Sequence, residues 1–340
     1  MTSAPPGPPP PETVEHVVWA AGLAPSVHNT QPWRFTAAGD VLELHADRSR
    51  QLAVLDPDGR QLHLSCGAAL EHARVCARSL GLDPAVTLLP DPASPDLLAR
   101  LVLSPGPPAT PDETALADAA VHRHTHRSAF EPRHVGAEAL EELRAAVDAE
   151  GAGLRTIDGE DDRVALTVLL SLADSEEVRD PAYRAELAAW AGIAGAPDEG
   201  IPAAALDPEQ GRGSSLQLRR FTTAEPPPPG DEPPAAQHAD VVVVVTPRDQ
   251  PTDWLTGGQA IGALLLRATL LGLAAQPLGQ VTDKDAYRHR LARELGLAGV
   301  PQMALRIGYA RDTRPTTHRR QVSEVLRRST PSAGDTRMGT

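Results

Sequence analysis

Aromatic residues and cysteines are scarce in this chain. Phe, Tyr and Trp together make up 3% of its 340 residues, and the only cysteines are Cys66 and Cys76. These two lie ten residues apart in one predicted helix, a separation too long for a disulfide bond. The chain therefore lacks the disulfide framework of small secreted domains, and we expect reduced thiols and a cytoplasmic location.

Long hydrophobic runs and a basic excess are also missing. The most apolar run, 261–273, is interrupted by Arg267 and is shorter than the roughly 20 residues that span a bilayer. The first eleven residues contain six prolines and no apolar core, unlike a secretory signal. A formal charge of -13 disfavours binding to a phosphate backbone. We therefore expect no membrane span and no nucleic-acid partner.

Proline, in contrast, is abundant, with 34 residues. Residues 1–11 and 329–340 are predicted to be disordered ends, and the proline cluster at 226–234 is predicted to be a loop because proline removes backbone donors. The length of the chain allows one large domain or two ordinary ones.

Apolar spacing predicts a mixture of helices and strands between these segments. The predicted helices cover residues 12–23, 66–80, 115–121, 137–147, 162–174 and 256–271. The predicted strands cover residues 41–44, 86–89, 97–103, 241–245 and 303–309. Five consecutive valines at 241–245 are typical of a strand that is buried on both faces.

An internal repeat links the two halves of the chain. Residues 66–82 align without gaps with residues 257–273, and six of the seventeen positions are identical, including Gly67 with Gly258. Small residues at intervals of three or four allow two helices to approach closely. We therefore expect the two copies to pack against each other at the centre of the molecule.

The segment Ala24–Phe35 is a dense row of short polar side chains between two prolines. Such a loop could recognise a planar polar heterocycle through edge hydrogen bonds. On composition alone we favour the alternative, a surface turn that is anchored by a buried Trp33.

The segment Val121–Phe130 carries Arg123 and Arg127, with Thr125 between them. Arginine is the side chain best shaped for bidentate contact with phosphate. Four histidines, His122, His124, His126 and His134, raise the alternative of a metal site. No acidic or thiol partner lies among them, so we favour a solvated or phosphate-facing role and predict no metal.

A third basic segment follows the predicted strand that ends near Tyr309. It contains Arg311, Arg314, Arg319 and Arg320. This cluster could bind an anion, or it could be a solvated basic tail.

Together these motifs resemble the nitroreductase superfamily of FMN-dependent oxidoreductases, in which FMN lies at the interface of two subunits. The family's arginine motif, similar to residues 123–127, holds the phosphate and the flavin edge. Its flavin-contacting loop is matched here by Pro25, Ser26, Asn29, Gln31, Pro32 and Trp33. The segment whose backbone N–H reaches flavin N5 is similar to Pro277, Leu278, Gly279 and Gln280, and the C-terminal basic residue of the phosphate site resembles Arg319 or Arg320.

The order of these motifs predicts a duplicated chain. The loop of residues 24–35 has no arginine motif before it, and the second half has no equivalent loop near residues 150–157. We interpret the chain as a fused, monomeric pseudo-dimer similar to the Acg-like branch, with one complete flavin site and one that is lost. The predicted fold is α+β, with nitroreductase-like halves at 12–110 and 115–328.

An insertion at about 183–240 has no counterpart in the first half. The resemblance implies a lid over the flavin, with Arg184, Glu186, Trp190 and Pro202 near the substrate face.

The resemblance implies an NAD(P)H-dependent oxidoreductase that passes hydride through flavin N5 to a nitroaromatic or quinone-like acceptor. Thr125 and the other matched residues would bind FMN, Arg127 would stabilise charge on the reduced flavin, and Gly279 would contact the reacting edge. One alternative is a protein that stores FMN beneath a closed lid with little turnover. Another is a structural pseudo-dimer that binds no flavin.

Overall fold

The computed structural model describes residues 8–193, 199–206, 214, 216, 218–221, 238–312 and 317–328. Residues 226–234 and 329–340, predicted to be irregular, lie outside this part, as do residues 1–7 of the proline-rich start. Pro11, the last residue of that start, is already the first residue of helix α1.

The first half of the chain forms two long helices and a sheet. The elements are α1 (Pro11–Gly22), a short 3-10 turn (Val27–Asn29), β1 (Trp33–Ala38), β2 (Val41–Ala46), a second 3-10 turn (Arg48–Arg50), α2 (Arg60–Ser79), β3 (Leu82–Leu88) and β4 (Leu97–Pro105). The apolar faces of α1, α2 and this sheet enclose a shared core.

The second half contains the remaining elements. Up to the insertion these are α3 (Pro111–His122), α4 (Ala137–Ala149), β5 (Gly153–Thr156) and α5 (Glu160–Arg179). The insertion contributes α6 (Pro181–Trp190), β6 (Ala191–Ile193), β7 (Ile201–Pro202) and a 3-10 turn (Ala203–Ala205). The rest are β8 (Asp240–Thr246), α7 (Pro251–Leu270), β9 (Ala274–Pro277), α8 (Gln280–Asp283), α9 (Asp285–Glu294), β10 (Val300–Gly308), α10 (Val322–Val325) and β11 (Leu326–Arg328).

The two halves repeat one sheet topology. The first sheet has the strand order β1-β2-β4-β3 and the second has β5-β8-β10-β9, so corresponding strands occupy corresponding places. Every neighbouring pair within these two sets is antiparallel. The predicted α+β fold with two tandem halves is confirmed. The predicted strand of five valines is β8, and four of those valines are buried.

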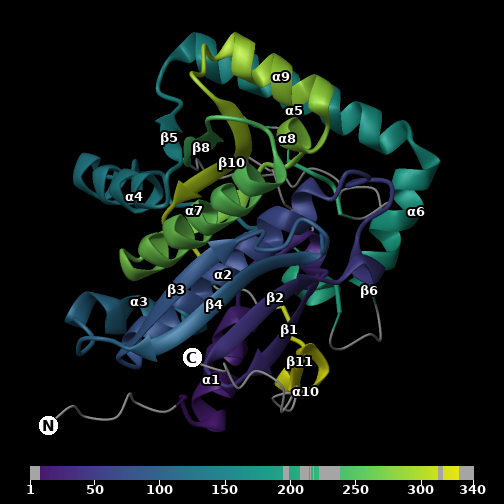
Figure 1. Cartoon of the computed structure of the whole chain (residues 1–340). Coiled ribbons are helices and arrows are strands. Elements are labelled where there is room, and N and C mark those ends of the chain that lie inside the picture. The colour runs from purple at the N-terminus through teal and green to yellow at the C-terminus, as the bar shows by residue number, and fades with distance from the viewer. Residues whose placement is uncertain are drawn as a thin grey trace, which may run out of the picture.

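The repeated helices α2 and α7 cross at the centre of the molecule (Figure 1). A Cβ atom on Gly67 would lie 2.9 Å from Cα of Gly258, and one on Gly258 would lie 2.8 Å from Cα of Gly67. Each would also collide with a backbone carbonyl of the opposite helix, that of Leu255 or Leu64. Leu64 and Leu255 are equivalent positions in the repeat, as Gly67 and Gly258 are, so each helix makes the same contact with the other. Only glycine at both positions permits this approach.

The end of the chain returns to the first half. β11 pairs in parallel with β1, with Phe35 opposite Leu326, and extends the first sheet by one strand (Figure 1). The sequence analysis placed everything up to residue 328 in the second half. This return brings Arg319 and Arg320 beside the loop that precedes β1.

The start of one predicted helix differs clearly from the structure. Helix α2 begins at Arg60, six residues before the predicted start, because the Asp56 carboxylate accepts the N–H groups of Gln61 and Leu62 and caps its first turn. The segment around Thr125 forms a single β-bridge to Ala275.

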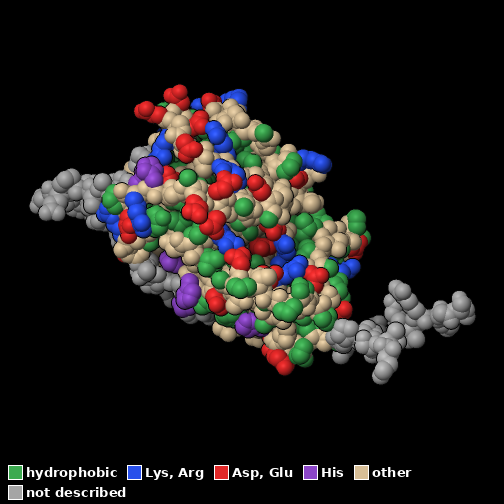
Figure 2. Space-filling view, turned by 90° about the vertical axis from the view of Figure 1, so that its left-hand side faces the viewer, with side chains coloured by type: hydrophobic (Ala, Val, Ile, Leu, Met, Phe, Trp, Pro, Cys, Tyr) green, Lys and Arg blue, Asp and Glu red, His purple; other side chains and the backbone are tan. Residues whose placement is uncertain are grey.

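None of the helices that the structure describes is long and apolar enough to cross a bilayer. On the face shown in Figure 2, acidic and basic side chains are interspersed.

The glycine contact between α2 and α7 gives a first prediction. Gly258→Ala should lower the free energy of unfolding by about 1–3 kcal/mol or more, because the added methyl group meets backbone atoms that cannot rotate away. Denaturant unfolding of the full chain measures this change. Gly22→Ala is the matched control: it lies in α1 with no atom within 4 Å of the new Cβ, and it should be neutral or slightly stabilising. Equal stability of wild type and Gly258→Ala would show that the helices do not approach this closely.

Candidate functional site

A cavity opens between the two halves and encloses about 870 Å³, including its mouth. Six of the predicted site residues line it: Pro25, Ser26, Thr125, Arg127, Pro277 and Gly279. Helices α2 and α7 form its floor, through Ala68 and Leu265 among others. Pockets between domains are common ligand sites, and this one needs both halves of the chain.

The loop of residues 24–35 adopts an unusual backbone conformation. His28, Asn29 and Gln31 have positive φ angles of 47°, 56° and 49°. Ser26 Oγ accepts the N–H of Gln31 at 2.9 Å, and Trp33 is completely buried. Non-glycine residues in this conformation cost free energy and cluster at functional sites. The loop is thus anchored by a buried tryptophan, as a structural turn would be, and it also forms part of the cavity wall.

Asn29 and Gln31 use their side chains to hold the C-terminal segment. Asn29 Oδ1 accepts from Arg319 Nη1 at 3.0 Å, and its Nδ2 donates to the Gly200 carbonyl at 2.9 Å. Gln31 Oε1 accepts the N–H of Arg320 at 2.8 Å. Arg320 also donates to the carbonyls of Gln31 and Trp33. None of these four side chains lines the cavity. The contacts hold the C-terminal segment against the loop and so fix the position of Arg319.

Three arginines gather next to the cavity without an acidic partner among the described residues. Arg123 Nη2 and Arg319 Nη2 both donate to the Leu23 carbonyl, each at 3.2 Å. Arg123 Nε and Nη1 and Arg319 Nε are buried and have no hydrogen-bond partner in the described part of the chain. Arg127 is 9% exposed and lies against the Phe221 ring.

The electrostatics of this cluster favour an anion. Burial, with repulsion from Arg319 and Arg127, lowers the pKa of Arg123 to about 9. Burial, with repulsion from Arg319, lowers the pKa of Arg127 to about 10. Burial lowers the pKa of Arg319 to about 10. Buried, unsatisfied cations are costly, and phosphate oxygens would both neutralise them and accept their free N–H groups.

The segment 277–279 enters the site beside Thr125. His126 N–H donates to the Ala275 carbonyl at 3.0 Å, which joins the arginine segment to the edge strand β9. Leu278 N–H is occupied by the Ala304 carbonyl at 2.7 Å. Gly279 lines the cavity, and a side chain there would approach the Asp283 carboxylate at 3.1 Å. Because glycine has no side chain, Gly279 borders the cavity with backbone atoms only.

The insertion covers one side of the cavity. Ile201, Arg219 and Phe221 line it, whereas Arg184, Glu186, Trp190 and Pro202, the lid residues named from the sequence, are not among the lining residues. Glu186 instead accepts the N–H groups of Val54 and Leu55, each at 2.9 Å, and anchors α6 to the first half.

Arg219 joins the insertion to α5 and α8 and to the loop of residues 24–35. Its Nη2 donates to Glu177 Oε1 at 2.9 Å and to Asp283 Oδ2 at 2.5 Å. Its Nη1 lies 3.4 Å from His28 Nε2. Burial and the charges of Arg219 and Arg127 lower the pKa of His28 well below its usual value, so this imidazole is neutral. With Nε2 facing a donor, the proton is on Nδ1, which has no partner among the described residues.

The sequence analysis did not assign several of these residues to the site. Gln61 and Ser65 line the cavity from α2, and their spacing of four residues places them on one helix face. That spacing was a usable signal. For Arg219 and Phe221 no local signal exists, since they come from an irregular part of the insertion.

The repeat relates Ala68 and Leu265 on the cavity wall to equivalent residues on the opposite flank of the α2–α7 crossing, which is the counterpart site. At these equivalent positions the side chains are long and polar. Ala68 corresponds to Gln259, and Leu265 corresponds to Arg74. Arg74 Nη1 donates to Glu71 at 2.6 Å and to Glu150 at 2.5 Å, and Gln259 Nε2 donates to Glu150 at 3.0 Å. Burial raises the pKa of Glu71 to about 8, against the opposing effect of Arg74. Long polar side chains thus occupy the space that Ala68 and Leu265 leave open on the other side.

Sequence comparisons identify relatives of this chain. A protein-family model described as "Nitroreductase family" matches residues 5–56 and 226–309 of the sequence. Rv3131 of Mycobacterium tuberculosis, whose name describes it as a candidate NAD(P)H nitroreductase, is 37% identical over 324 residues, which cover 93% of this chain and 91% of that protein. The M. tuberculosis protein acg, named in the same way, is 32% identical over 318 residues and covers 93% and 95% of the two chains.

Among solved structures, the FMN and NADPH-dependent nitroreductase NfnB from sphigopyxis sp. strain HMH is 19% identical to this chain. The match covers 62% of this chain and 97% of that one, with a TM-score of 0.40.

The arginine cluster gives a second prediction. Arg123→Met should raise the stability of the ligand-free protein by about 1–3 kcal/mol, because it removes a buried cation that lacks a counter-charge. Inorganic phosphate should raise the melting temperature of wild type by binding the folded state, and should do so much less in this variant. Thermal unfolding with and without phosphate measures both effects. Arg144→Met, at a partly exposed arginine on α4, is the control, and a loss of stability in Arg123→Met would contradict this expectation.

Proposed function

Because the chain belongs to the nitroreductase family, we propose that it is an FMN-dependent oxidoreductase that uses NAD(P)H to reduce a nitroaromatic or quinone-like acceptor. The observation that carries this proposal is a buried arginine cluster, without an acidic partner in the part of the chain that the structure describes, beside a cavity built from both halves. An anionic group on a larger planar ligand satisfies both features at once. The relatives are named as nitroreductases, which supports the same assignment.

The residues of the chain fit FMN in distinct ways. Arg123 and Arg319 would hold the phosphate, through buried N–H groups that have no acceptor among the described residues. Arg127, which lines the cavity, would lie beside the flavin edge. Pro25, Ser26, Thr125, Pro277 and Gly279 would surround the ring system, because they line the adjacent cavity. Asn29, Gln31, Leu278 and Arg320 would act indirectly, by fixing the backbone and Arg319. When bound, FMN would supply the hydride and electron chemistry that no side chain here provides.

Two groups would tune the reaction. Arg127 is a buried cation on the cavity wall, so it would stabilise negative charge that develops on a ligand there. The Gly279 backbone lies on the same wall and is not shielded by a side chain, which suits it to contact the reacting edge. The insertion, through Phe221 and Arg219, would exclude water from the site.

The chain would bind one FMN and act as a monomer. The counterpart site is occupied by Arg74, Glu150 and Gln259, and the interface between the two nitroreductase-like units is already internal to the chain. The halves would extend over about 12–110 and 115–328, with the final strand exchanged to the first sheet.

Anaerobic titration tests the function directly. Purified protein with its FMN quantified per chain is titrated with NADPH and then with NADH, and flavin absorbance is followed near ~450 nm. We expect bleaching by one of the two nucleotides at one FMN per chain, and reoxidation by an added nitroaromatic or quinone. A yellow band that survives both nucleotides and bleaches only with dithionite would instead identify a flavin-storing protein, in which Arg219 and Phe221 keep the cavity closed. A chain that cannot be reconstituted with FMN would exclude both functions.

Substitution of two of the arginines should separate binding from tuning. Arg123→Ala should weaken FMN binding by about 1–3 kcal/mol, the contribution of a charge-assisted contact. Arg127→Ala should mainly lower the midpoint potential of the bound flavin and have a smaller effect on FMN affinity. The reason is that the Arg127 cation stabilises the negative charge of the reduced flavin, and the variant lacks that cation. Equilibrium dialysis and potentiometric titration measure the two quantities, with Arg144→Ala as the control. If Arg127→Ala changed only affinity, its assigned role would be wrong.

A further inference from the structure

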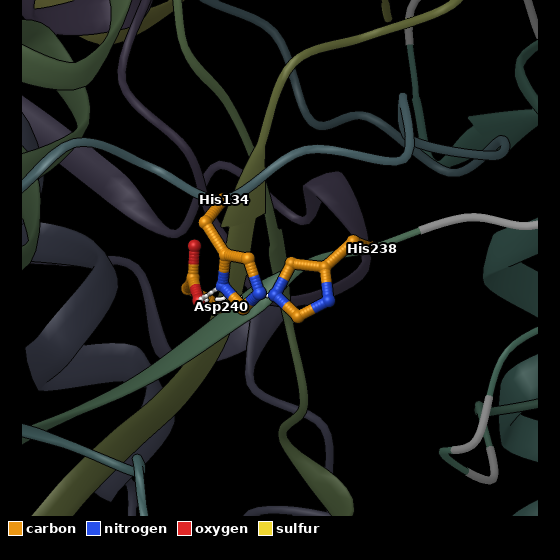
Figure 3. Close-up of side chains that lie close together, drawn as sticks. All are labelled: His134, His238 and Asp240. Atoms are coloured by element: carbon orange, nitrogen blue, oxygen red, sulfur yellow. Dashed lines mark hydrogen bonds and ion pairs between the residues drawn. The ribbon is translucent and has the colours of Figure 1, made fainter.

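Two histidines and an aspartate meet at the start of β8, away from the cavity. His134 Nδ1 lies 3.0 Å from Asp240 Oδ1, and His238 Nε2 lies 3.1 Å from the same oxygen. The two imidazole rings are 3.6 Å apart between centroids. Figure 3 shows both rings directed at the carboxylate. None of the three residues lines the cavity, so they are independent of the site described above.

We propose that His134, His238 and Asp240 form a binding site for a divalent transition-metal ion of the Zn²⁺ class. One potential ligand atom from each residue lies within 4.8 Å of the others. Zn²⁺ bonds to imidazole nitrogen and carboxylate oxygen are about 2.0–2.2 Å, so tetrahedral ligands lie roughly 3.3 Å apart. The observed separations between the nitrogens and the shared oxygen fall close to that value.

The surroundings hold the three side chains in place before any ion binds. Asp240 Oδ2 accepts the N–H of Val135 at 2.7 Å, which orients the carboxylate and leaves Oδ1 toward the histidines. The backbone N–H of His238 donates to the Glu131 carbonyl at 3.2 Å, so the two chain segments are already joined. Such outer hydrogen bonds are a regular feature of metal sites because they fix the ligands.

The chemistry of the donors selects the type of ion. Two imidazoles and one carboxylate suit Zn²⁺ and neighbouring transition metals, whereas Mg²⁺ and Ca²⁺ prefer oxygen ligands alone. The His134 side chain is 73% exposed, so water can reach the remaining coordination positions. Three protein ligands with access for water make an open site.

A bound ion would cross-link two parts of the chain that are distant in sequence. His134 follows the arginine segment, and His238 and Asp240 mark the point where the insertion ends and β8 begins. The ion would hold the end of the insertion against the segment that carries Arg123 and Arg127. Its main effect is therefore on the stability of the folded chain, which gives a readout that does not depend on flavin or on activity.

Zn²⁺ binding to the full, tag-free, chelator-treated chain tests the proposal. Competition with a chromophoric zinc chelator should show one tight Zn²⁺ per chain, and Zn²⁺ should raise the melting temperature. His134→Gln, His238→Gln and Asp240→Asn should each weaken binding by about 10–100-fold or more and remove the thermal shift. Asn at position 240 can still accept the N–H of Val135, so this variant keeps the local hydrogen bond.

His122→Gln and His289→Gln are the matched controls, because both histidines are exposed and lie outside the cluster. They should bind Zn²⁺ as wild type does. The proposal would be overturned if wild type bound less than one Zn²⁺ per chain, or if the three ligand variants bound Zn²⁺ with unchanged affinity. The cluster would then be a hydrogen-bonded His-Asp-His group without a metal-binding role. If one variant fails to fold, as judged by circular dichroism without Zn²⁺, the other two decide the outcome.

Discussion

The structure depends on the direct backbone contact between Gly67 and Gly258. Because neither residue has a side chain, α2 and α7 can approach until each glycine meets a carbonyl of the opposite helix. This contact sets the distance between the two halves of the chain. The cavity lies on the flank of that crossing, with Ala68 from one helix and Leu265 from the other on its wall. A bulkier contact would separate the halves and open the site.

The site is built at a cost to the stability of the ligand-free fold. Arg123, Arg127 and Arg319 are buried close together although they repel one another, and Arg123 and Arg319 both donate to the Leu23 carbonyl. The positive φ angles of His28, Asn29 and Gln31 add strain in the same place. Such features persist when the surrounding structure enforces them and when a ligand offsets their cost. Both features lie where the two halves meet, beside the cavity.

The duplicated halves have diverged in a way that the geometry explains. The sheets keep one strand order, and the central helices keep their glycine contact, because both are needed for the halves to pack. The two flanks of the crossing are free to differ. One keeps small and apolar residues and remains open, while the other is filled by Arg74, Glu150 and Gln259. Symmetry is thus retained in the core and lost on the two flanks of the crossing.

Local patterns in the sequence were sufficient for much of this description. Apolar spacing predicted helices α1 to α5 and α7 and strands β2, β3, β4, β8 and β10, because burial of one face imposes a period on the residues that form it. The repeat predicted the crossing of α2 and α7, and the motifs predicted a site with Pro25, Ser26, Thr125, Arg127, Pro277 and Gly279, which do line one cavity. β1 was not predicted, because the polar loop motif extends over its first residues.

Only the tertiary structure decided which distant residues meet. Arg319 faces the arginine cluster while Arg320 binds loop carbonyls, and two adjacent arginines carry no sequence signal that tells them apart. Arg219 reaches the cavity from an irregular segment, and His134 finds its partners His238 and Asp240 more than a hundred residues away. The sequence determined the elements and the chemistry available to them, because those depend on neighbours along the chain. The structure decided burial, pairing and charge balance, because those depend on neighbours in space.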